Sequence, residues 1–198
     1  MLLMRKNHNR TNNGPAKPAL FLDRDGVINK DFGYVHSKKN FEFMPGIFDL
    51  VSTANKAGYL CVVLTNQSGI GRGLYSKQEF QELSTWMCQQ FSARDAFIDA
   101  IYYSPFHPTK AKGEYLLKED TRKPGMGMFK EAIIDLNIDV SRSIMVGDNI
   151  SDMRASLSAN IKSSYLICPS IDLEIKKDIE AEINVISNFL PIITLLNS

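Results

Sequence analysis

The sequence predicts an α/β protein built on a Rossmann-like, doubly wound parallel sheet. Short apolar runs alternate along the chain with segments whose apolar residues recur at helical spacing, which is typical of parallel strands covered by helices on both faces. A length of 198 residues suits one domain. We therefore expect a single domain with loop lids over its site and no large cap domain.

Composition and charge exclude several classes of protein. The chain is 44% hydrophobic and 23% charged, which excludes a disordered, collagenous or coiled-coil protein. Lys and Arg number 23 against 22 Asp and Glu, so the formal net charge of +1 gives no field that would attract nucleic acid or an anionic membrane. We therefore expect no nucleic-acid partner and no membrane partner. Independently of the charge, we expect a small-molecule substrate and a monomer.

The cysteines and the first residues bear on the compartment. Cys61, Cys88 and Cys168 are odd in number, far apart and set among apolar neighbours, as core residues are in a reducing compartment. The apolar stretch Met1–Met4 ends at Arg5 and is too short for a signal-peptide core, and no later run approaches the roughly 20 apolar residues of a membrane span. We therefore expect a cytoplasmic protein.

The predicted strands begin after a polar N-terminal segment. Residues 1–17 carry four basic residues and no acidic one, so we predict a flexible basic tail, with a nucleic-acid-binding arm as the less favoured alternative, ahead of a domain at 18–198. Apolar runs then predict six strands, at Ala19–Leu22, Tyr59–Leu64, Ile98–Tyr103, Ser143–Val146, Ser163–Ile167 and Ile183–Ile186.

Helical spacing predicts helices between these strands. Apolar residues at i, i+3, i+4 and i+7 mark one helix over Ile47–Ala54. Ser76 and Glu79 have the form of a capping box and predict a second helix. A third follows Pro124-Gly125, and a shorter one follows Ser151.

The remaining segments are a terminal helix and two long loops. Residues 188–196 predict the terminal helix, whose first turn suits Pro191. Residues 29–45 and 104–122 are polar and poorly periodic, and loops of this length in a compact domain are usually functional or disordered. We take these two loops as the candidate lids.

Polar clusters stand at the carboxyl ends of three predicted strands. Asp23-Arg24-Asp25-Gly26 follows the first strand, Thr65 to Gly69 follows the second, and Gly147-Asp148-Asn149 follows the fourth, with Asp152 next. Ligands in open parallel sheets bind outside the carboxyl ends of the strands. The three clusters should therefore converge on one site.

Four aspartates would crowd this site, namely Asp23, Asp25, Asp148 and Asp152. At about 4 Å each pair of like charges costs on the order of 4 kcal/mol at an effective dielectric constant of 20. Mg²⁺ takes oxygen ligands, and it usually combines a few carboxylates with water and substrate phosphate. We therefore expect Mg²⁺ to neutralise the cluster.

The spacing of Asp23 and Asp25 indicates a division of labour. Residues two apart in an extended segment point to the same side, so one carboxylate can attack a phosphate ester while the other exchanges a proton with the leaving group. Thr65, the N–H groups of the glycine-containing turn after it and Lys123 can hold the phosphoryl oxygens. Taken alone, an Asp-x-Asp pair is more often a solvated turn, and the glycines at 69–73 can simply permit a tight turn.

Four motifs stand in order along the chain: Asp23-x-Asp25-Gly26, Thr65-Asn66, Lys123-Pro124 and Gly147-Asp148-x-x-x-Asp152. Together they resemble the motifs of the haloacid dehalogenase superfamily of phosphotransferases. Longer strings are similar to the D-glycero-D-manno-heptose 1,7-bisphosphate 7-phosphatases and, next to them, to the histidinol-phosphate phosphatases. These strings are Asp23 to Asn29, Gly33 to His36, Thr65 to Gly73 and Arg122-Lys123-Pro124.

The resemblance implies roles for individual residues. Asp23 would be the nucleophile and a metal ligand, and Asp25 would be the general acid and base that also binds the metal through its backbone carbonyl. Thr65 and Lys123 would stabilise the transferring phosphoryl group, and Asp148 would complete the Mg²⁺ ligands.

The resemblance also implies a supporting set around the substrate. Asp152 is expected to lie behind the metal ligands without binding the ion itself. The residues expected around the sugar and its second phosphate are Asp31, Phe32, Gly33, Tyr34, Asn66, Gln67, Ser68, Arg122 and Asn149.

The chain departs from the resemblance in two places. Zinc-carrying relatives have a Cys-x-His and a Cys-x-Cys pair in the loop before the Arg-Lys-Pro motif, at the positions of Ser104, Phe106, Glu119 and Thr121 here. A structural Zn²⁺ needs a full set of such ligands, so we predict no zinc. Asn149 stands where relatives often have Lys.

Three functional hypotheses follow. The first is a Mg²⁺-dependent phosphatase that removes the 7-phosphate of the heptose bisphosphate through an aspartyl-phosphate, in ADP-heptose and lipopolysaccharide core precursor synthesis. The second is the same chemistry on another phosphomonoester, such as histidinol phosphate. The third is a non-catalytic binding protein on the same fold, which the presence of Asp23, Asp25 and Asp148 disfavours.

Overall fold

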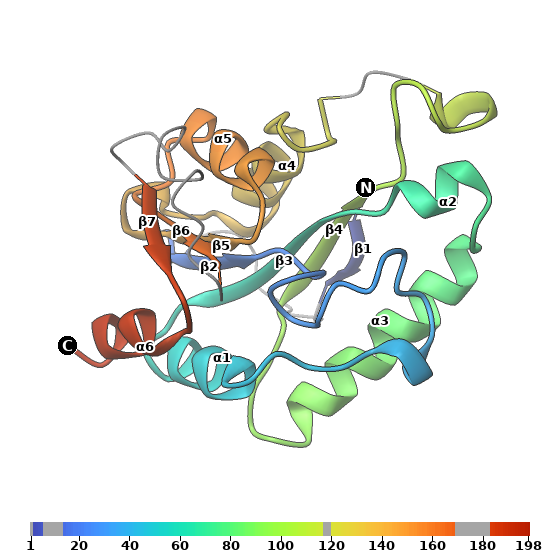
Figure 1. Ribbon diagram of the computed structural model, residues 1–198. Coiled ribbons are helices and arrows are strands. Elements are labelled where there is room, and N and C mark those ends of the chain that lie inside the picture. Colours follow the sequence, from blue (N-terminus) through green and yellow to red (C-terminus); the bar gives the residue numbers. More distant parts are fainter. Residues whose placement is uncertain (1, 6–13, 117–119, 169–182) are drawn as a thin grey trace.

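One seven-stranded sheet forms the centre of the computed structural model, which describes residues 2–5, 14–116, 120–168 and 183–198 (Figure 1). The strands are β1 (Leu2–Arg5), β2 (Ala19–Leu22), β3 (Leu60–Asn66), β4 (Ala100–Ser104), β5 (Ile144–Gly147), β6 (Ser163–Ile167) and β7 (Ile183–Ile186). Their order is β1-β4-β3-β2-β5-β6-β7. All pairs from β4 to β7 are parallel, and β1 runs antiparallel to β4 at one edge. The predicted α/β class is confirmed.

Helices cover both faces of the sheet (Figure 1). They are α1 (Ile47–Lys56), α2 (Ser68–Arg72), α3 (Lys77–Ser92), α4 (Gly127–Leu136), α5 (Ile150–Ser158) and α6 (Leu190–Leu196), with short 3₁₀ helices at Lys38–Asn40, Gly113–Tyr115 and Val140–Arg142. Residues of α1, α3 and α6 belong to one core cluster and residues of α4 and α5 to another. The chain thus forms a single doubly wound α/β domain.

The central strand β2 shows why the predicted strands were continuous apolar runs. Leu20 and Leu22 pack in the cluster on one face, and Ala19 and Phe21 pack in the cluster on the other. All four side chains are fully buried. A strand that is buried on both faces has no solvent side, so every position along it is apolar.

Local capping signals mark the helix starts. The Ser76 Oγ accepts from the Glu79 N–H at 3.1 Å while the Glu79 carboxylate accepts from the Ser76 N–H at 2.7 Å, which confirms the predicted capping box of α3. Helix α5 begins at Ile150, slightly before the predicted start, because Asn149 caps it and accepts from the Ser151 N–H at 2.9 Å. Pro191 lies in the first turn of α6, as predicted.

Two predictions about irregular segments are wrong. Residues 2–5, predicted within a flexible tail, form β1, because the open edge of β4 offers main-chain partners and Leu3 packs against the core. The tail prediction rested on the basic charge of the segment and on how little of it could be buried, and residues 6–13 lie outside the described residues. The glycine-containing segment after β3, predicted as a turn, forms α2, which Gly73 ends with a φ of 73°.

The strand ends and the helices together define which segments can meet. Strand β3 continues to Asn66, beyond the predicted end at Leu64, so Thr65 is itself a strand residue. Among the described residues, none of the helices has the length and apolar composition that crossing a bilayer requires. The carboxyl ends of β2, β3 and β5 lie side by side, since these strands are parallel neighbours.

Substitution of Ser143, which links the starts of β2 and β5, should destabilise the domain. Its buried Oγ accepts from the Ala19 N–H at 2.9 Å and donates to the Asp139 carbonyl at 2.6 Å. We expect Ser143→Ala to lower the free energy of unfolding by about 1–3 kcal/mol, because a buried N–H and a C=O lose their partner. Denaturant unfolding measures this loss. The control Ser158→Ala, at the exposed end of α5, should stay within about 0.5 kcal/mol, and equal unfolding of Ser143→Ala and the parent would refute the link.

Candidate active site

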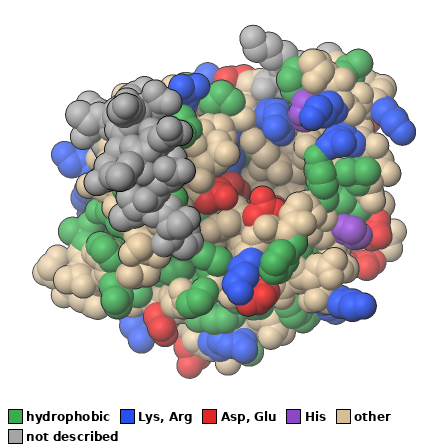
Figure 2. All heavy atoms as spheres, viewed as in Figure 1, with side chains coloured by type: hydrophobic (Ala, Val, Ile, Leu, Met, Phe, Trp, Pro, Cys, Tyr) green, Lys and Arg blue, Asp and Glu red, His purple; other side chains and the backbone are tan. Residues whose placement is uncertain are grey.

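A pocket of about 640 Å³ lies at the carboxyl ends of β2, β3 and β5. Figure 2 shows acidic side chains at the floor of a hollow in the centre of this face. Both predicted lids contribute to its walls, the first through Tyr34 and the second through Arg122. The volume lies within the range of roughly 300–1,000 Å³ that is typical of small-molecule sites.

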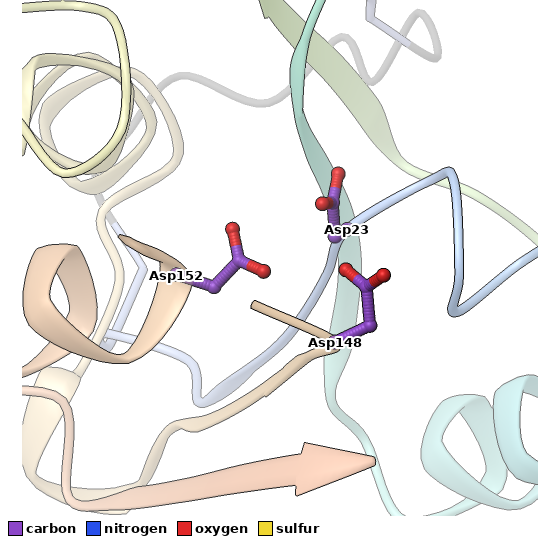
Figure 3. A group of neighbouring side chains, drawn as sticks. All are labelled: Asp23, Asp148 and Asp152. Atoms are coloured by element: carbon purple, nitrogen blue, oxygen red, sulfur yellow. The ribbon is translucent and has the colours of Figure 1, made fainter. Parts of the chain in front are cut away.

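Three carboxylates meet at the floor of the pocket. Asp23, Asp148 and Asp152 each bring one oxygen within 4.8 Å of the others. Asp23 follows β2, Asp148 follows β5 and Asp152 lies in the first turn of α5, and Figure 3 shows the three side chains grouped together. The convergence of distant segments that the sequence predicted is therefore observed. The Asp25 carboxylate is not a member of this group.

Two glycines make room for the carboxylates. A Cβ on Gly26 would lie 2.0 Å from the Asp148 Oδ2, and a Cβ on Gly147 would lie 2.4 Å from the Asp152 Cβ. Gly26 also has a φ of +86°, a left-handed conformation that favours glycine. The glycine in each of these two motifs is therefore required by the close approach of an acidic side chain.

Lys123 brings a buried positive charge to the cluster. Its side chain is 1% exposed, and its Nζ lies 3.1 Å from the Asp23 Oδ1 and 2.7 Å from the Asp152 Oδ1. The Nζ also donates to the Leu64 carbonyl at 2.7 Å. Burial alone would lower the pKa of Lys123, but the carboxylates of Asp152 and Asp23 outweigh it and raise the pKa. The ammonium group therefore stays charged and is shared between the two aspartates.

The carboxylates carry more negative charge than Lys123 can balance. Burial raises the pKa of Asp23 to about 8; Lys123 opposes this shift, and the neighbouring carboxylates add to it. Asp148 keeps one side open to solvent, but the walls of the pocket remove part of its hydration and, with the charge of Asp152, raise its pKa to about 7. Such carboxyl groups hold protons near neutral pH unless a further cation neutralises them.

The donor set fits a hard divalent cation. The carboxylate oxygens of Asp23, Asp148 and Asp152 are candidate ligands, and oxygen ligands suit Mg²⁺. Asp152 is 1% exposed, and its carboxylate is engaged by Lys123 and by the Asn149 N–H at 3.1 Å. These contacts suit a residue that holds the lysine and the start of α5.

The Asp25 carboxylate is surrounded by hydrogen-bond donors from three side chains. Arg24, which is 1% exposed, donates to the Asp25 Oδ2 from Nε at 3.1 Å and from Nη2 at 2.8 Å. The Asn29 Nδ2 donates to Oδ1 at 3.0 Å, and the Gln67 Nε2 donates to Oδ2 at 3.1 Å. A carboxylate with several donors, one of them charged, is held in a single orientation. The sequence prediction missed Arg24 and Asn29 in this role, although a charged residue directly after a buried strand was a usable signal.

Thr65 and Asn66 end β3 beside the carboxylates. Thr65 is buried, and its Oγ1 accepts from the Gln67 Nε2 at 2.8 Å. Asn66 clamps the main chain of Lys123, since its Nδ2 donates to the Lys123 carbonyl and its Oδ1 accepts from the Lys123 N–H, each at 3.1 Å. Asn66 lines the pocket, but its amide groups are engaged with the protein. Its observed contacts therefore position the lysine.

The rim contains most of the residues expected around the substrate. Phe32 is the exception, because it is 60% exposed and does not line the pocket. Asp31 accepts from the Gly33 N–H at 2.8 Å, and this tight turn leaves the Phe32 side chain in solvent. Arg72, which the prediction missed, hydrogen-bonds the Tyr34 hydroxyl and lies over its ring at 4.9 Å. The expected residues that do line the pocket are Asp31, Gly33, Tyr34, Asn66, Gln67, Ser68, Arg122 and Asn149.

The described positions that the resemblance relates to zinc ligands take part in packing and hydrogen bonds. The Ser104 Oγ lies 3.4 Å from the Thr121 Oγ1, and the Phe106 ring packs against Tyr115 at 5.8 Å. Glu119 lies outside the described residues. The described part of this loop is held by these contacts and by the Lys112 N–H, which donates to the Gly71 carbonyl of α2 at 2.8 Å.

Comparisons with known proteins identify relatives. The chain matches the family model described as polynucleotide kinase 3 phosphatase over residues 20–181. A D-glycero-beta-D-manno-heptose-1,7-bisphosphate 7-phosphatase from Haemophilus influenzae is 46% identical over 149 residues, which cover 75% of this chain and 80% of that protein. A D-glycero-alpha-D-manno-heptose-1,7-bisphosphate 7-phosphatase from Burkholderia mallei is 47% identical over 150 residues, which cover 76% of this chain and 79% of that protein.

A solved structure shares the fold. The D,D-heptose 1,7-bisphosphate phosphatase from B. bronchiseptica, complexed with magnesium and phosphate, has a TM-score of 0.79 at 23% identity and covers 91% of this chain and 98% of its own. At 23% identity this structure shows a shared fold only. The family model and the relatives at 46–47% identity show membership of a sequence family. These two findings show that the chain belongs to the family of the D-glycero-D-manno-heptose-1,7-bisphosphate 7-phosphatases within the haloacid dehalogenase superfamily.

Proposed function

We propose that this protein is a Mg²⁺-dependent phosphatase that removes the 7-phosphate of D-glycero-D-manno-heptose 1,7-bisphosphate, in the synthesis of ADP-heptose and the lipopolysaccharide core. One observation carries the proposal. The Asp23 carboxylate lies beside Asp148 and the Lys123 ammonium, in a pocket large enough for a sugar phosphate. The relatives named above are phosphatases of this substrate by name.

Asp23 is the nucleophile of the first step. Its carboxylate oxygen attacks phosphorus, the bond between phosphorus and O7 of the sugar breaks, and Asp25 donates a proton to the departing oxygen. The products are the dephosphorylated sugar and an aspartyl-phosphate on Asp23. Lys123, whose Nζ is 3.1 Å from the Asp23 Oδ1, and the Thr65 hydroxyl donate to the phosphoryl oxygens.

Water completes the reaction in the second step. Asp25, now a carboxylate, takes a proton from the water whose oxygen bonds to phosphorus, and the bond between phosphorus and Asp23 breaks. Inorganic phosphate leaves, Asp23 is a carboxylate again and Asp25 is protonated for the next cycle. The two aspartates have different surroundings: the Lys123 ammonium lies 3.1 Å from the Asp23 Oδ1, and donors around Asp25 hold its carboxylate in one orientation.

Asp23, Asp148 and the backbone carbonyl of Asp25 would hold Mg²⁺. When bound, the ion neutralises the carboxylates and withdraws negative charge from the phosphoryl oxygens. Asp152 holds Lys123 in place at 2.7 Å. The proposal includes no zinc, because the hydroxyls of Ser104 and Thr121 replace ligands that zinc requires.

The rim would bind the rest of the substrate. The Arg122 Nη1 donates to the Phe106 carbonyl at 3.3 Å, and the guanidinium has further N–H groups from which a second phosphate can accept. The Tyr34 ring, held by Arg72, offers a flat wall for the sugar. The other proposed contacts are Asp31, Gly33, Ser68 and Asn149.

The proposal also includes a cytoplasmic monomer without nucleic-acid or membrane partners. Cys61 is a core residue, and burial raises the pKa of its thiol well above the usual range, so the side chain is an unreactive thiol that suits a reducing compartment.

A phosphate-release assay on a substrate panel tests the function. The panel contains both anomers of the heptose bisphosphate, histidinol phosphate and other sugar phosphates, with Mg²⁺ present. We expect the highest kcat/KM for a heptose bisphosphate. A higher kcat/KM for histidinol phosphate would contradict the substrate, and no Mg²⁺-dependent release from any compound would support a binding protein.

Asp23→Asn should remove turnover and keep the fold. We expect kcat to fall by at least about 10³-fold, because an amide cannot form the phosphoenzyme. The thermal midpoint should not fall, since Asn has the same shape and removes one charge from an acidic cluster. The control Asp95→Asn, at an exposed position, should keep parental kcat. Comparable kcat in Asp23→Asn and the parent would rule out covalent catalysis by this residue.

Mg²⁺ should stabilise the fold more at pH 8 than at pH 6. Without metal, the raised pKa values of Asp23, about 8, and Asp148, about 7, mean that the folded chain binds protons more tightly than the unfolded chain. The free energy of unfolding of the metal-free protein therefore falls as pH rises from about 4 through these values. A cation compensates the ionised carboxylates, so thermal midpoints in Mg²⁺ and in EDTA should differ more at pH 8.

The same preparation checks the identity of the metal. Activity should disappear in EDTA and return with Mg²⁺, and elemental analysis should find no stoichiometric zinc. If Mg²⁺ raised the thermal midpoint equally at both pH values, ionisation of Asp23 and Asp148 would not be the cause. Stoichiometric zinc would contradict the prediction that the loop at 104–122 binds no zinc.

A further inference from the structure

The Gln67 side chain is fully engaged inside the protein, although the sequence suggested a contact with the sugar. It is 1% exposed, between β3 and α2. Its Nε2 donates to the Asp25 Oδ2 at 3.1 Å and to the Thr65 Oγ1 at 2.8 Å, and its Oε1 accepts from the Tyr75 hydroxyl. Both N–H groups and the carbonyl of the amide are used, so the side chain has little left to offer a substrate.

Tyr75 helps to hold the amide in its orientation. The Asp25 carboxylate only accepts, so the amide nitrogen faces it, and the Tyr75 hydroxyl donates to the Oε1 on the other side of the amide. The opposite orientation would place the amide oxygen against the Asp25 carboxylate. Tyr75 is itself held, since its ring stacks on His36 at 5.2 Å and a Cβ on Gly69 would lie 2.1 Å from its Cε1.

The amide also directs the proton of Thr65. The Thr65 Oγ1 accepts from Gln67, so the hydroxyl proton of Thr65 is available to donate to a phosphoryl oxygen. Asp25 belongs to the segment after β2, and Thr65 belongs to β3. Gln67 thus connects two segments whose functional groups must meet the same phosphate.

We propose that Gln67 is a positioning residue, which fixes the Asp25 carboxylate and the Thr65 hydroxyl relative to each other and does not bind the sugar. This role rests on the proposed function, in which Asp25 protonates the leaving oxygen and Thr65 donates to the transferring phosphoryl group. A misplacement of about 1 Å between such groups can lower the rate about 10²-fold.

Two substrates with different leaving groups test the proposal. The kcat/KM value covers the steps up to formation of the aspartyl-phosphate. The sugar oxygen needs a proton from Asp25 in that step, whereas p-nitrophenolate is a good leaving group that needs no proton. Gln67→Met keeps the volume and removes the hydrogen bonds. We expect kcat/KM to fall about 10²-fold on the heptose bisphosphate, mainly through kcat, and by no more than about tenfold on p-nitrophenyl phosphate.

Tyr75→Phe is the second variant, because it keeps the ring and removes the hydroxyl that helps to hold the amide. We expect a smaller loss with the same preference for the sugar substrate. The double variant Gln67→Met with Tyr75→Phe should be no slower than Gln67→Met alone, since Tyr75 acts through Gln67. Gln81→Met, at an exposed position of α3, is the matched control and should leave kcat/KM on both substrates unchanged.

The outcomes separate the proposal from its alternatives. A rise in KM at constant kcat would overturn it and restore a sugar contact. Equal losses on both substrates would also overturn it, because Gln67 would then serve only the fold or the phosphate. Thermal unfolding shows whether Gln67→Met folds. If it does not fold, the kcat/KM values of Tyr75→Phe on the two substrates test the proposal instead. If the parent fails on the heptose bisphosphate, the proposed function fails, and the same ratio measured with the best alkyl phosphate of the panel still tests Gln67.

Discussion

Compensation of charge at the carboxyl ends of β2 and β5 is the constraint on which the site depends. A buried ammonium or a buried carboxylate is strongly destabilising without a partner, and Lys123, Asp23 and Asp152 satisfy one another at 2.7–3.1 Å. The surrounding structure maintains this arrangement, because the Leu64 carbonyl accepts from the ammonium and Asn66 clamps the lysine main chain. One lysine cannot neutralise the whole cluster, so the pKa values of Asp23 and Asp148 are raised. The same excess of negative charge favours the binding of Mg²⁺ by these carboxylates.

Two aspartates that are close in sequence obtain different environments. Asp23 lies among charges contributed by α5 and by the segment before α4, whereas Asp25 accepts from Arg24, Asn29 and Gln67. The chain leaves the extended conformation after Asp23, since the Arg24 carbonyl accepts from the Ile28 N–H at 2.8 Å and from the Asn29 N–H at 3.0 Å. Partners from distant parts of the chain then define the environment of each carboxylate. The two carboxylates are therefore held in different ways, Asp23 beside the Lys123 ammonium and Asp25 by a guanidinium and two amides.

The elements and motifs that depend on local pattern could be predicted. Strands such as β2 are apolar throughout because both faces are buried, and the α3 capping box is a contact within a few residues of Ser76. The failures share a different cause. Strand β1 exists because the edge of β4 is open to it, and Phe32 leaves the pocket because of a turn whose direction depends on the surrounding loop. The roles of Asn66 and Gln67 follow from partners far along the chain, Lys123 for the first and Asp25 for the second.

The order of motifs in this sequence was sufficient to identify an α/β phosphatase fold, its family and the aspartates that gather at the strand ends. The spacing of apolar residues, the helix caps and the glycines beside acidic residues involve residues that are close in the sequence. They can therefore be recognised without the structure. Packing in three dimensions was needed to distinguish a carboxylate that faces the cluster from one that faces an arginine, and an amide that lines a pocket from one that orients its neighbours. Those distinctions depend on side-chain direction and on contacts between distant segments, which form when the sheet brings its strands together.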